Sequence, residues 1–191
     1  MRTVTEPWRA ETELKRSRFL AHLVPYGDVP GLRERLRAEH PKANHVVYAH
    51  RHINEYDQIV ENSSDDGEPR GCAGAPVLGV MRGEELVECA ILIVRYFGGI
   101  KLGTGGMARA YGAAARAVVE AARLQPWERR HTRSFHCAYA HLRQVEYLLK
   151  RYGLESLERF FEGEGVRWEI RGTEEELEGF AREAGGLLRP G

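Results

Sequence analysis

The feature that most constrains this chain is an apolar segment that leads through a glycine-rich loop into a long helical pattern. The apolar run 89–94 is followed by Arg95, and glycines occupy positions 98, 99, 103, 105 and 106. From 104 to 122 apolar residues recur with the helical period, so we predict a strand, a loop and a helix. Glycine lacks a Cβ, which lets the loop backbone turn tightly and approach another group closely. Because the helix N-terminus presents free amide hydrogens, the loop favours either close packing or anion binding.

The charge balance excludes any strong overall attraction to a polyanion. The 191 residues include 28 Lys and Arg and 28 Asp and Glu, so the formal net charge is zero. Nucleic-acid or membrane contact would need a local patch. Three distant cysteines without a CxxC pair are typical of reduced thiols in a cytoplasm. Residues 1–20 lack the apolar core of a signal peptide, and no apolar run is long enough to cross a bilayer. We therefore expect a cytoplasmic protein without a membrane partner.

The break at Gln125-Pro126-Trp127 predicts two domains, 1–125 and 126–191, of the α+β class. In the first domain we predict strands at 19–24, 46–52 and 86–96, helices at 30–39, 73–81 and 104–122, and a polar, turn-rich loop at 53–70. The strand at 86–96 is expected to be central, because both of its faces are apolar. In the second domain we predict strands near 130–140, 154–162, 166–171 and 187–188 and helices near 141–152 and 174–184. That order is a split βαβ pattern.

The glycine loop nearly matches two phosphate-binding motifs. Gly98 and Gly103 have P-loop spacing, but Thr104 stands where that motif requires lysine, so we reject a P-loop. Residues 103–108 fit G-x-G-x-x-A, yet they lie several residues beyond the strand, and the domain ends after the helix. We therefore expect no dinucleotide cofactor. A tight packing loop and a contact site for an anion stay open as alternatives, and Thr104 is expected to be the N-cap of the helix.

A second candidate is the acidic turn at 62–69, in which Asp65, Asp66 and Glu68 surround a glycine. Oxygen-rich loops can hold hard cations, and His50 and His52, which share a strand face, could add ligands. The spacing of an EF-hand is absent. A solvated turn whose aspartates bond their own backbone is the alternative interpretation.

Three further features have ordinary structural explanations beside functional ones. Cys72 could be a reactive thiol near a helix start, or a small buried residue. An arginine stripe on the long helix could meet phosphates, or simply face solvent. Aromatic residues of the second domain could stack on bases, or pack in its core. The stripe is Arg109, Arg116 and Arg123, and the aromatic residues are Phe135, Tyr139, Phe160 and Phe161.

Several motifs closely resemble the IMPACT/YigZ family. The longest are SDDGEP at 64–69 followed by GCAGAP at 71–76, and RYFGGIKLGTGG at 95–106 followed by RAY at 109–111. Shorter agreements are KRSRF at 15–19 and Ala43-Asn44-His45 followed by Tyr48-Ala49. The resemblance covers about residues 10–123. The chain departs from the family at Cys72, where threonine is usual, and at Ala75, where a basic residue is common.

The resemblance implies a fold and a biological context. The first domain of such proteins is similar to the second domain of a small-subunit ribosomal protein, an α/β sandwich with a left-handed βαβ crossover. The tail is similar to the ferredoxin-like domains of elongation factor G. Eukaryotic IMPACT members regulate translation initiation in the amino-acid-starvation response through protein partners. Contact with nucleic acid or the ribosome is an inference from fold likeness, which is an associational argument. The threonine at the Cys72 position argues against an essential nucleophile there.

We therefore predict a translation-associated regulatory protein, not an enzyme, that binds RNA, the ribosome or a translation-factor partner through the glycine-loop region. No catalytic residue, metal or cofactor is expected. In this hypothesis the three carboxylates of the acidic turn order the loop by pairing with its cations. The alternative is a metal- or phosphate-dependent enzyme that uses the same three carboxylates. The predicted binding residues are Asp65, Asp66, Glu68, Arg70, Arg95, Gly98, Gly99, Lys101, Gly103, Thr104, Gly105, Gly106 and Arg109. The ligand and the oligomeric state stay open.

Overall fold

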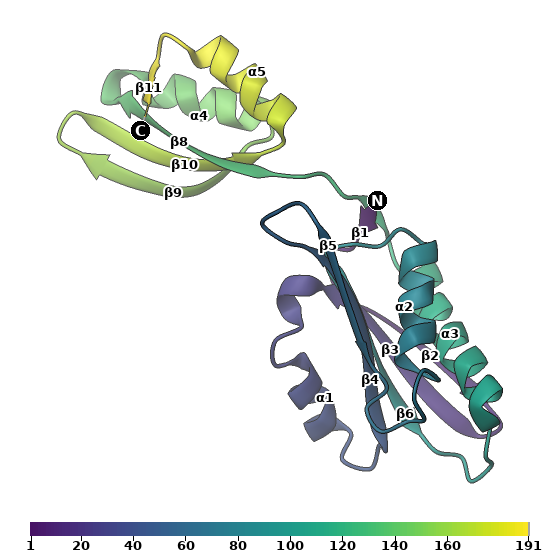
Figure 1. Cartoon of the computed structure of the whole chain (residues 1–191). Coiled ribbons are helices and arrows are strands. Elements are labelled where there is room, and N and C mark those ends of the chain that lie inside the picture. Colours follow the sequence, from purple (N-terminus) through teal and green to yellow (C-terminus); the bar gives the residue numbers. More distant parts are fainter. Residues whose placement is uncertain (191) are drawn as a thin grey trace. The chain divides into compact units, whose positions relative to one another are not determined.

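The computed structural model describes residues 1–190, which form two compact units, Met1–Trp127 and Glu128–Gly191 (Figure 1). The sequence places the boundary after residue 125, two residues earlier. Both units combine helices with antiparallel sheets, so the chain has a mixed α/β architecture. No helix within residues 1–190 has the length and the apolar character needed to cross a membrane.

The first unit is built on a five-stranded sheet with the strand order β2-β3-β6-β4-β5, in which every neighbouring pair is antiparallel. Its strands are β2 (Trp8–Leu14), β3 (Ser17–Pro25), β4 (His45–Ile53), β5 (Ile59–Ser64) and β6 (Cys89–Tyr96). The apolar run predicts β6 as a central strand, and the structure places it in the middle of the sheet with seven of its eight residues buried. Short strands β1 (Arg2–Thr3) and β7 (Gln125–Pro126) pair separately.

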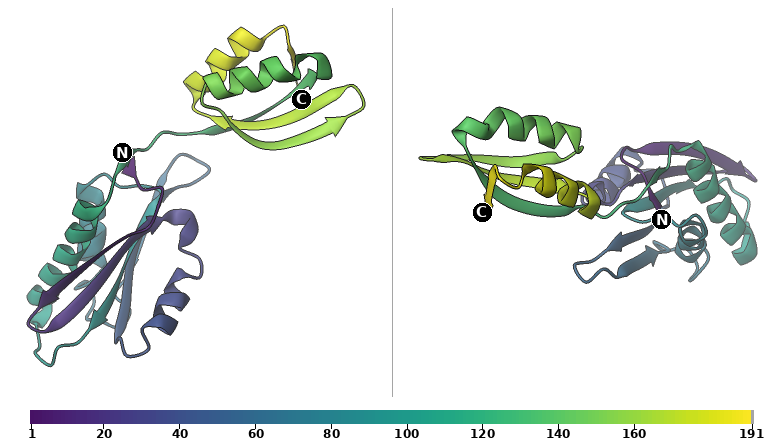
Figure 2. Two further views of the ribbon diagram at one scale, coloured as in Figure 1. Left: turned by 180° about the vertical axis from the view of Figure 1, so that it is seen from behind. Right: turned by 90° about the horizontal axis from the view of Figure 1, so that it is seen from above.

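Helices cover both faces of this sheet (Figures 1 and 2). On one face lie α2 (Gly74–Gly83) and α3 (Gly103–Ala121), and on the other lies α1 (Leu32–Glu39), after the 3₁₀ turn η1 (Tyr26–Asp28). Alternate residues of β6 face opposite sides, because side chains alternate along a strand. Ile91 and Ile93 therefore pack beneath α2 and α3, whereas Leu92 and Val94 pack beneath α1.

The long helix α3 lies close to the sheet, as its small residues predict. Tyr111 is fully buried and meets the Phe19 ring edge-on, with 5.1 Å between ring centroids. Ala121, which the helical period assigns to the buried face, is exposed, whereas Val118 and Val119 of the same turn are buried. Arg109, Arg116 and Arg123 are exposed, in agreement with a solvent-facing stripe.

Two strands of the five-stranded sheet, β2 and β5, are absent from the sequence prediction. Residues 53–70 are predicted to be a loop, but β5 lies within them and pairs with β4. β5 and β2 are the two edge strands of the sheet. An edge strand keeps polar residues that face water, so it lacks the continuous apolar run of a buried strand. That is why composition alone conceals both strands.

The second unit has the element order β-α-β-β-α-β and a four-stranded antiparallel sheet in the order β11-β8-β10-β9. Trp168, fully buried, lies at the centre of its core beside Phe135 and Phe180. Thr173 and Glu176 form a capping box at the start of the last helix. The elements are β8 (His131–Ala138), the turn η2 (Tyr139–His141), α4 (Leu142–Arg151), β9 (Glu155–Glu162), β10 (Gly165–Gly172), α5 (Glu174–Ala184) and β11 (Leu188–Pro190).

Candidate functional site

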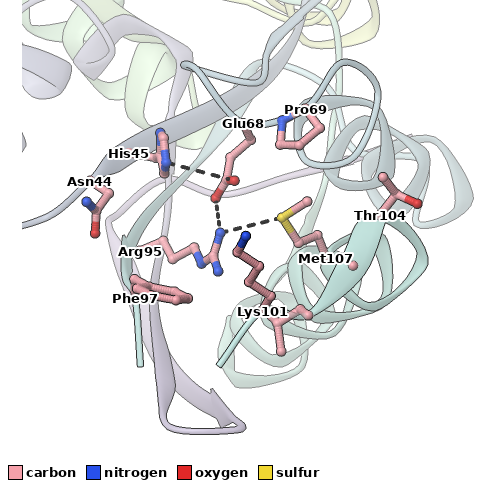
Figure 3. Close-up of a pocket in the computed structure, with 11 residues that line it drawn as sticks. Asn44, His45, Glu68, Pro69, Arg95, Phe97, Lys101, Thr104 and Met107 are labelled. Atoms are coloured by element: carbon pink, nitrogen blue, oxygen red, sulfur yellow. Dashed lines mark hydrogen bonds and ion pairs between the residues drawn. The ribbon is translucent and has the colours of Figure 1, made fainter. Parts of the chain in front are cut away.

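A cavity of about 390 Å³ opens in the first unit where the glycine loop meets the acidic turn (Figure 3). Its lining comes from the start of β4, the acidic turn, the end of β6 and the first turn of α3. We call it the loop pocket. Its lining residues are Asn44, His45, Glu68, Pro69, Arg95, Phe97, Lys101, Leu102, Gly103, Thr104 and Met107.

A buried ion pair forms one wall of the loop pocket. An Nη1 hydrogen of Arg95 is donated to Oε1 of Glu68, and the hydroxyl of Tyr111 donates to the same oxygen over 2.8 Å. The side chains of Glu68 and Arg95 are 4% and 7% exposed. Burial, followed by the Glu68 charge, raises the pKa of Tyr111, so this phenol stays protonated and remains a donor. Removing either charge would leave the other buried without compensation.

The guanidinium of Arg95 is not fully satisfied by these contacts. Its Nη1 also lies 3.5 Å from the Met107 sulfur, whereas its buried Nε has no hydrogen-bond partner. The guanidinium carbon lies 5.7 Å from the Phe19 ring centroid and 5.8 Å from that of Phe97. Figure 3 shows the head group directed into the pocket, which Lys101 also lines. A buried cation with an unmade hydrogen bond is uncommon in a folded protein and requires an explanation.

The glycine loop makes both the close approach and the tight turn that its glycines predict. At Gly98 a Cβ would stand 2.1 Å from the carbonyl carbon of Arg16, and its N–H donates to Ser17 Oγ over 3.1 Å. This glycine is therefore a packing position, over the hairpin turn between β2 and β3. Gly99 and Gly103 instead have φ of +84° and +69° with open space around them. Their positive φ requires glycine for the turn of the loop itself.

The N-terminus of α3 is open, and Thr104 is not its N-cap. The helix begins at Gly103, and the preceding residue, Leu102, makes no side-chain capping bond. The positive φ of Gly103 turns the chain directly into the helix, so Thr104 becomes its second residue. Both Gly103 and Thr104 are exposed and line the loop pocket. The amide hydrogens of Gly103, Thr104 and Gly105 precede the first bond of the helix and are left to solvent or a ligand.

Two predicted cations lie outside the loop pocket. Lys101 is exposed and contributes to the lining, but Arg70 and Arg109 do not. Of the predicted set, the pocket brings together Glu68, Arg95, Lys101, Gly103 and Thr104.

Asp65 does not pair with the loop cations, contrary to expectation. Its carboxylate accepts hydrogen bonds from the backbone N–H groups of Gly71 (2.7 Å), Ala73 (3.0 Å) and Gly74 (2.8 Å). Burial raises the pKa of Asp65, but the three N–H groups outweigh it and, with Arg70, hold that pKa below its usual value. Asp65 therefore acts as the anion at the N-terminus of α2, which starts at Gly74.

Asp66 also pairs with groups outside the glycine loop. Its carboxylate pairs with Arg33 at 2.6 Å and with Arg37, both on α1, and accepts from the Val46 N–H over 2.6 Å. These partners lie 20 or more residues away in the sequence, so no local pattern identifies them. Only Glu68 among the three carboxylates pairs with a loop cation. No group of three or more His, Cys, Asp or Glu residues within 1–190 is placed to hold a metal.

The site contains residues that the sequence analysis does not select: Asn44, His45, Phe97 and Met107. Nδ1 of His45 lies 2.7 Å from the Asp66 carbonyl oxygen, and its Nε2 lies 3.8 Å from Glu68 Oε2. A carbonyl oxygen only accepts, so the hydrogen of the neutral ring belongs on Nδ1. Nε2 is then an acceptor at the pocket wall. The available signal for Asn44 and His45 is the short motif at 43–49.

The other candidate residues lie outside the loop pocket. His52 stacks on Tyr26 with 4.2 Å between centroids, and burial, followed by the His52 charge, lowers the pKa of His50. Cys72 is buried. In the second unit Phe135 is buried, whereas Tyr139, Phe160 and Phe161 are exposed.

Comparison with known proteins identifies the family. Residues 15–119 match the Impact N-terminal domain. The chain is 34% identical to an IMPACT family member of Haemophilus influenzae over 91% of this chain and 85% of that protein. It is 36% identical to the IMPACT family member YigZ of Escherichia coli over 72% and 69% of the two chains. A crystal structure of a hypothetical protein superposes with a TM-score of 0.71 at 29% identity, over 98% of this chain and 94% of that one. The protein therefore belongs to the IMPACT family.

Proposed function

We propose that this protein is a cytoplasmic regulator of translation that binds RNA at the loop pocket. The observation that carries the proposal is the convergence of Arg95, Lys101 and the open N-terminus of α3 on one cavity. A neutral chain needs such a local patch, because it has no overall attraction to a polyanion. Phosphate contacts from Lys, Arg and helix N-termini are the main contribution to RNA affinity. The family resemblance supplies the connection to translation.

The architecture supports finer fold assignments within this proposal. The β-α-β-β-α-β order and the strand order β11-β8-β10-β9 support a ferredoxin-like second domain, similar to those of elongation factor G. In the first unit β3 and β4 both run antiparallel to β6, so the connection through α1 joins parallel strands across β6. A left-handed crossover there, as in the ribosomal-protein domain, stays a prediction. Domains at 1–125 and 126–191 are part of the same proposal.

Filter binding of a single-stranded RNA oligonucleotide across a salt series tests RNA binding. We expect log K to fall linearly with log salt, and Lys101→Ala to reduce that slope by about one. Lys150→Ala, which removes an exposed lysine of α4 in the second unit, is the matched control and should leave the slope unchanged. No binding at low salt, or equal slopes for both variants, would contradict the proposal. Capture of a protein from extract that persists after nuclease treatment would indicate a protein partner instead.

The enzyme alternative has less support from the geometry. Asp65 and Asp66 are held by the α2 N-terminus and by α1 arginines, so neither presents a free carboxylate to the loop pocket. Calorimetry with divalent metals and nucleotides, repeated with Asp66→Ala, distinguishes the enzyme alternative from the RNA-binding proposal. Metal-dependent heat that disappears in the variant would favour the enzyme.

A further inference from the structure

The loop pocket has walls of two kinds. One kind is cationic and rich in hydrogen-bond donors: Lys101, the first turn of α3 and Arg95, which pairs with Glu68. The other surfaces are apolar and include Phe97, Met107 and Pro69. Its volume of about 390 Å³ lies within the range of small-ligand sites, which is about 300–1,000 Å³. Phosphate contact along an RNA backbone requires only the cationic end, so the apolar walls need a separate explanation.

We propose that the loop pocket binds a single nucleotide unit, with its phosphate at the N-terminus of α3 and its base against Phe97. This inference rests on the proposed function and specifies the ligand of the same site. The shared chemistry is a phosphate monoester joined to a planar ring. Its source is either a free nucleoside monophosphate or the 5′-phosphorylated end of an RNA.

The phosphate end is supported by two independent observations. The 19-residue helix α3 presents an N-terminus without a side-chain cap, and Lys101 stands beside it. Separately, Arg95 is only 6% exposed, yet its Nε has no hydrogen-bond partner. An oxyanion here would combine the amide donors, the helix dipole and the charge of Lys101, beside an Arg95 guanidinium whose charge Glu68 already offsets.

The same unit contains an internal example of this arrangement. At the N-terminus of α2 the carboxylate of Asp65 accepts from three backbone N–H groups. At α3 the chain supplies no such anion from Leu102, the residue in the N-cap position. A helix of 19 residues carries the same positive end as the helix of 10 residues that Asp65 satisfies.

The base end is supported by Phe97 and by the polar rim. Phe97 is 49% exposed although it lies against the Arg95 guanidinium, so one ring face remains available. Nucleic-acid bases stack on such rings, and each stack contributes about 1–3 kcal/mol. Nδ1 of His45 is taken up by the Asp66 carbonyl oxygen, so Nε2 is the ring nitrogen left for a polar group of a base. Asn44 adds an exposed carboxamide at the same rim.

Isothermal titration calorimetry of the full chain with AMP, adenosine and inorganic phosphate tests the proposal. We expect AMP to bind at least about tenfold more tightly than either fragment, because both ends of the pocket contribute. Phe97→Ala should weaken AMP binding at least about fivefold, and Lys101→Ala should weaken AMP more than adenosine. The controls are Phe161→Ala, which removes an exposed ring of the second unit, and Lys150→Ala. Equal affinity for AMP and phosphate, or no effect of Phe97→Ala, would overturn the base contact.

Two RNA oligonucleotides of one sequence, with a 5′-phosphate or a 5′-hydroxyl, separate the two sources. Preference for the phosphorylated end, lost in Phe97→Ala, assigns the pocket to an RNA terminus. Binding of AMP without any binding of RNA supports the nucleotide pocket and contradicts the proposed RNA function. Salt-dependent RNA binding without AMP binding or end preference would contradict the proposed nucleotide site but not the proposed binding of RNA.

Discussion

The two long helices on the same face of the first sheet begin in opposite ways. The N-terminus of α2 is satisfied by Asp65, a carboxylate from the acidic turn. The N-terminus of α3 has no side-chain cap and opens onto the loop pocket beside Lys101. The acidic turn and the glycine loop both have the residue types of a binding site. Of the two helix ends that they meet, only that of α3 has unused hydrogen-bond donors. The difference shows that a site depends on which groups remain unsatisfied after folding, and not only on which residues are present.

The largest expected effect comes from removing the packing that fixes the glycine loop. Gly98→Ala places a Cβ 2.1 Å from backbone of the β2–β3 turn, so we expect a loss of about 3 kcal/mol in the free energy of unfolding. Gly99→Ala meets no neighbour and suffers only from its φ of +84°, which costs about 1 kcal/mol. Urea denaturation of both variants measures the difference. Equal losses would show that the loop is not anchored at Gly98.

Removing the anion of α2 should have the next largest effect. Asp65→Ala leaves three backbone N–H groups without their acceptor, and we expect a loss of about 2 kcal/mol in unfolding free energy. Asp28→Ala, at an exposed acid in η1, is the matched control and should change stability by less than about 0.5 kcal/mol. If the two variants are equally stable, Asp65 does not function as the α2 anion.

The charge of Asp65 makes its contribution dependent on pH. Its folded pKa is below the unfolded value of 3.8, so the unfolded chain binds the proton more readily in acid. The stabilisation is complete above that value and is lost as pH falls through the folded pKa. Comparing the wild-type protein with Asp65→Asn, we expect a constant stability difference above about pH 5, which decreases below 3.8. Urea titrations at a series of pH values measure it, and a difference that grows in acid would contradict the assignment.

The smallest effect is expected from giving α3 an anion of its own. Thr104→Asp places a carboxylate in the first turn, which should stabilise the protein by about 0.5 kcal/mol through the helix dipole. The same charge should weaken AMP and RNA binding, since it occupies the position of the phosphate. Thr104→Asn has nearly the same shape as Thr104→Asp but lacks the charge, so it should bind AMP and RNA almost as tightly as the wild-type protein. Unchanged binding by Thr104→Asp would separate the α3 N-terminus from the ligand.

The periodic and motif-rich parts of the fold could be predicted from the sequence. β6 and α3 follow from a buried apolar run and a helical period, and the motif that spans their junction identifies Arg95, Lys101 and Thr104 as candidates. The edge strand β5 was concealed by its polar residues. Most helices and strands of the second unit could be predicted, because clear turn signals separate them in the sequence.

The partners of the acidic turn could not be predicted, because they depend on contacts between distant segments. Asp66 meets arginines of α1 that precede it by about 30 residues, and Asp65 reaches the start of a later helix. His45 enters the pocket only because β4 pairs with β6, which places its backbone opposite Arg95. The type of a residue marks it as a candidate for ligand binding. Only the folded structure shows whether its hydrogen-bonding groups are already used by other parts of the protein.

The most direct test of the account is a ¹H–¹⁵N NMR titration of the full chain with AMP. We predict that the amide signals of Gly103, Thr104 and Gly105 shift together and saturate, because these amides meet the phosphate at the open end of α3. The amides of Gly71, Ala73 and Gly74, already held by Asp65, should stay unmoved. Saturating shifts confined to other parts of the chain, or no shifts at any AMP concentration, would contradict the account.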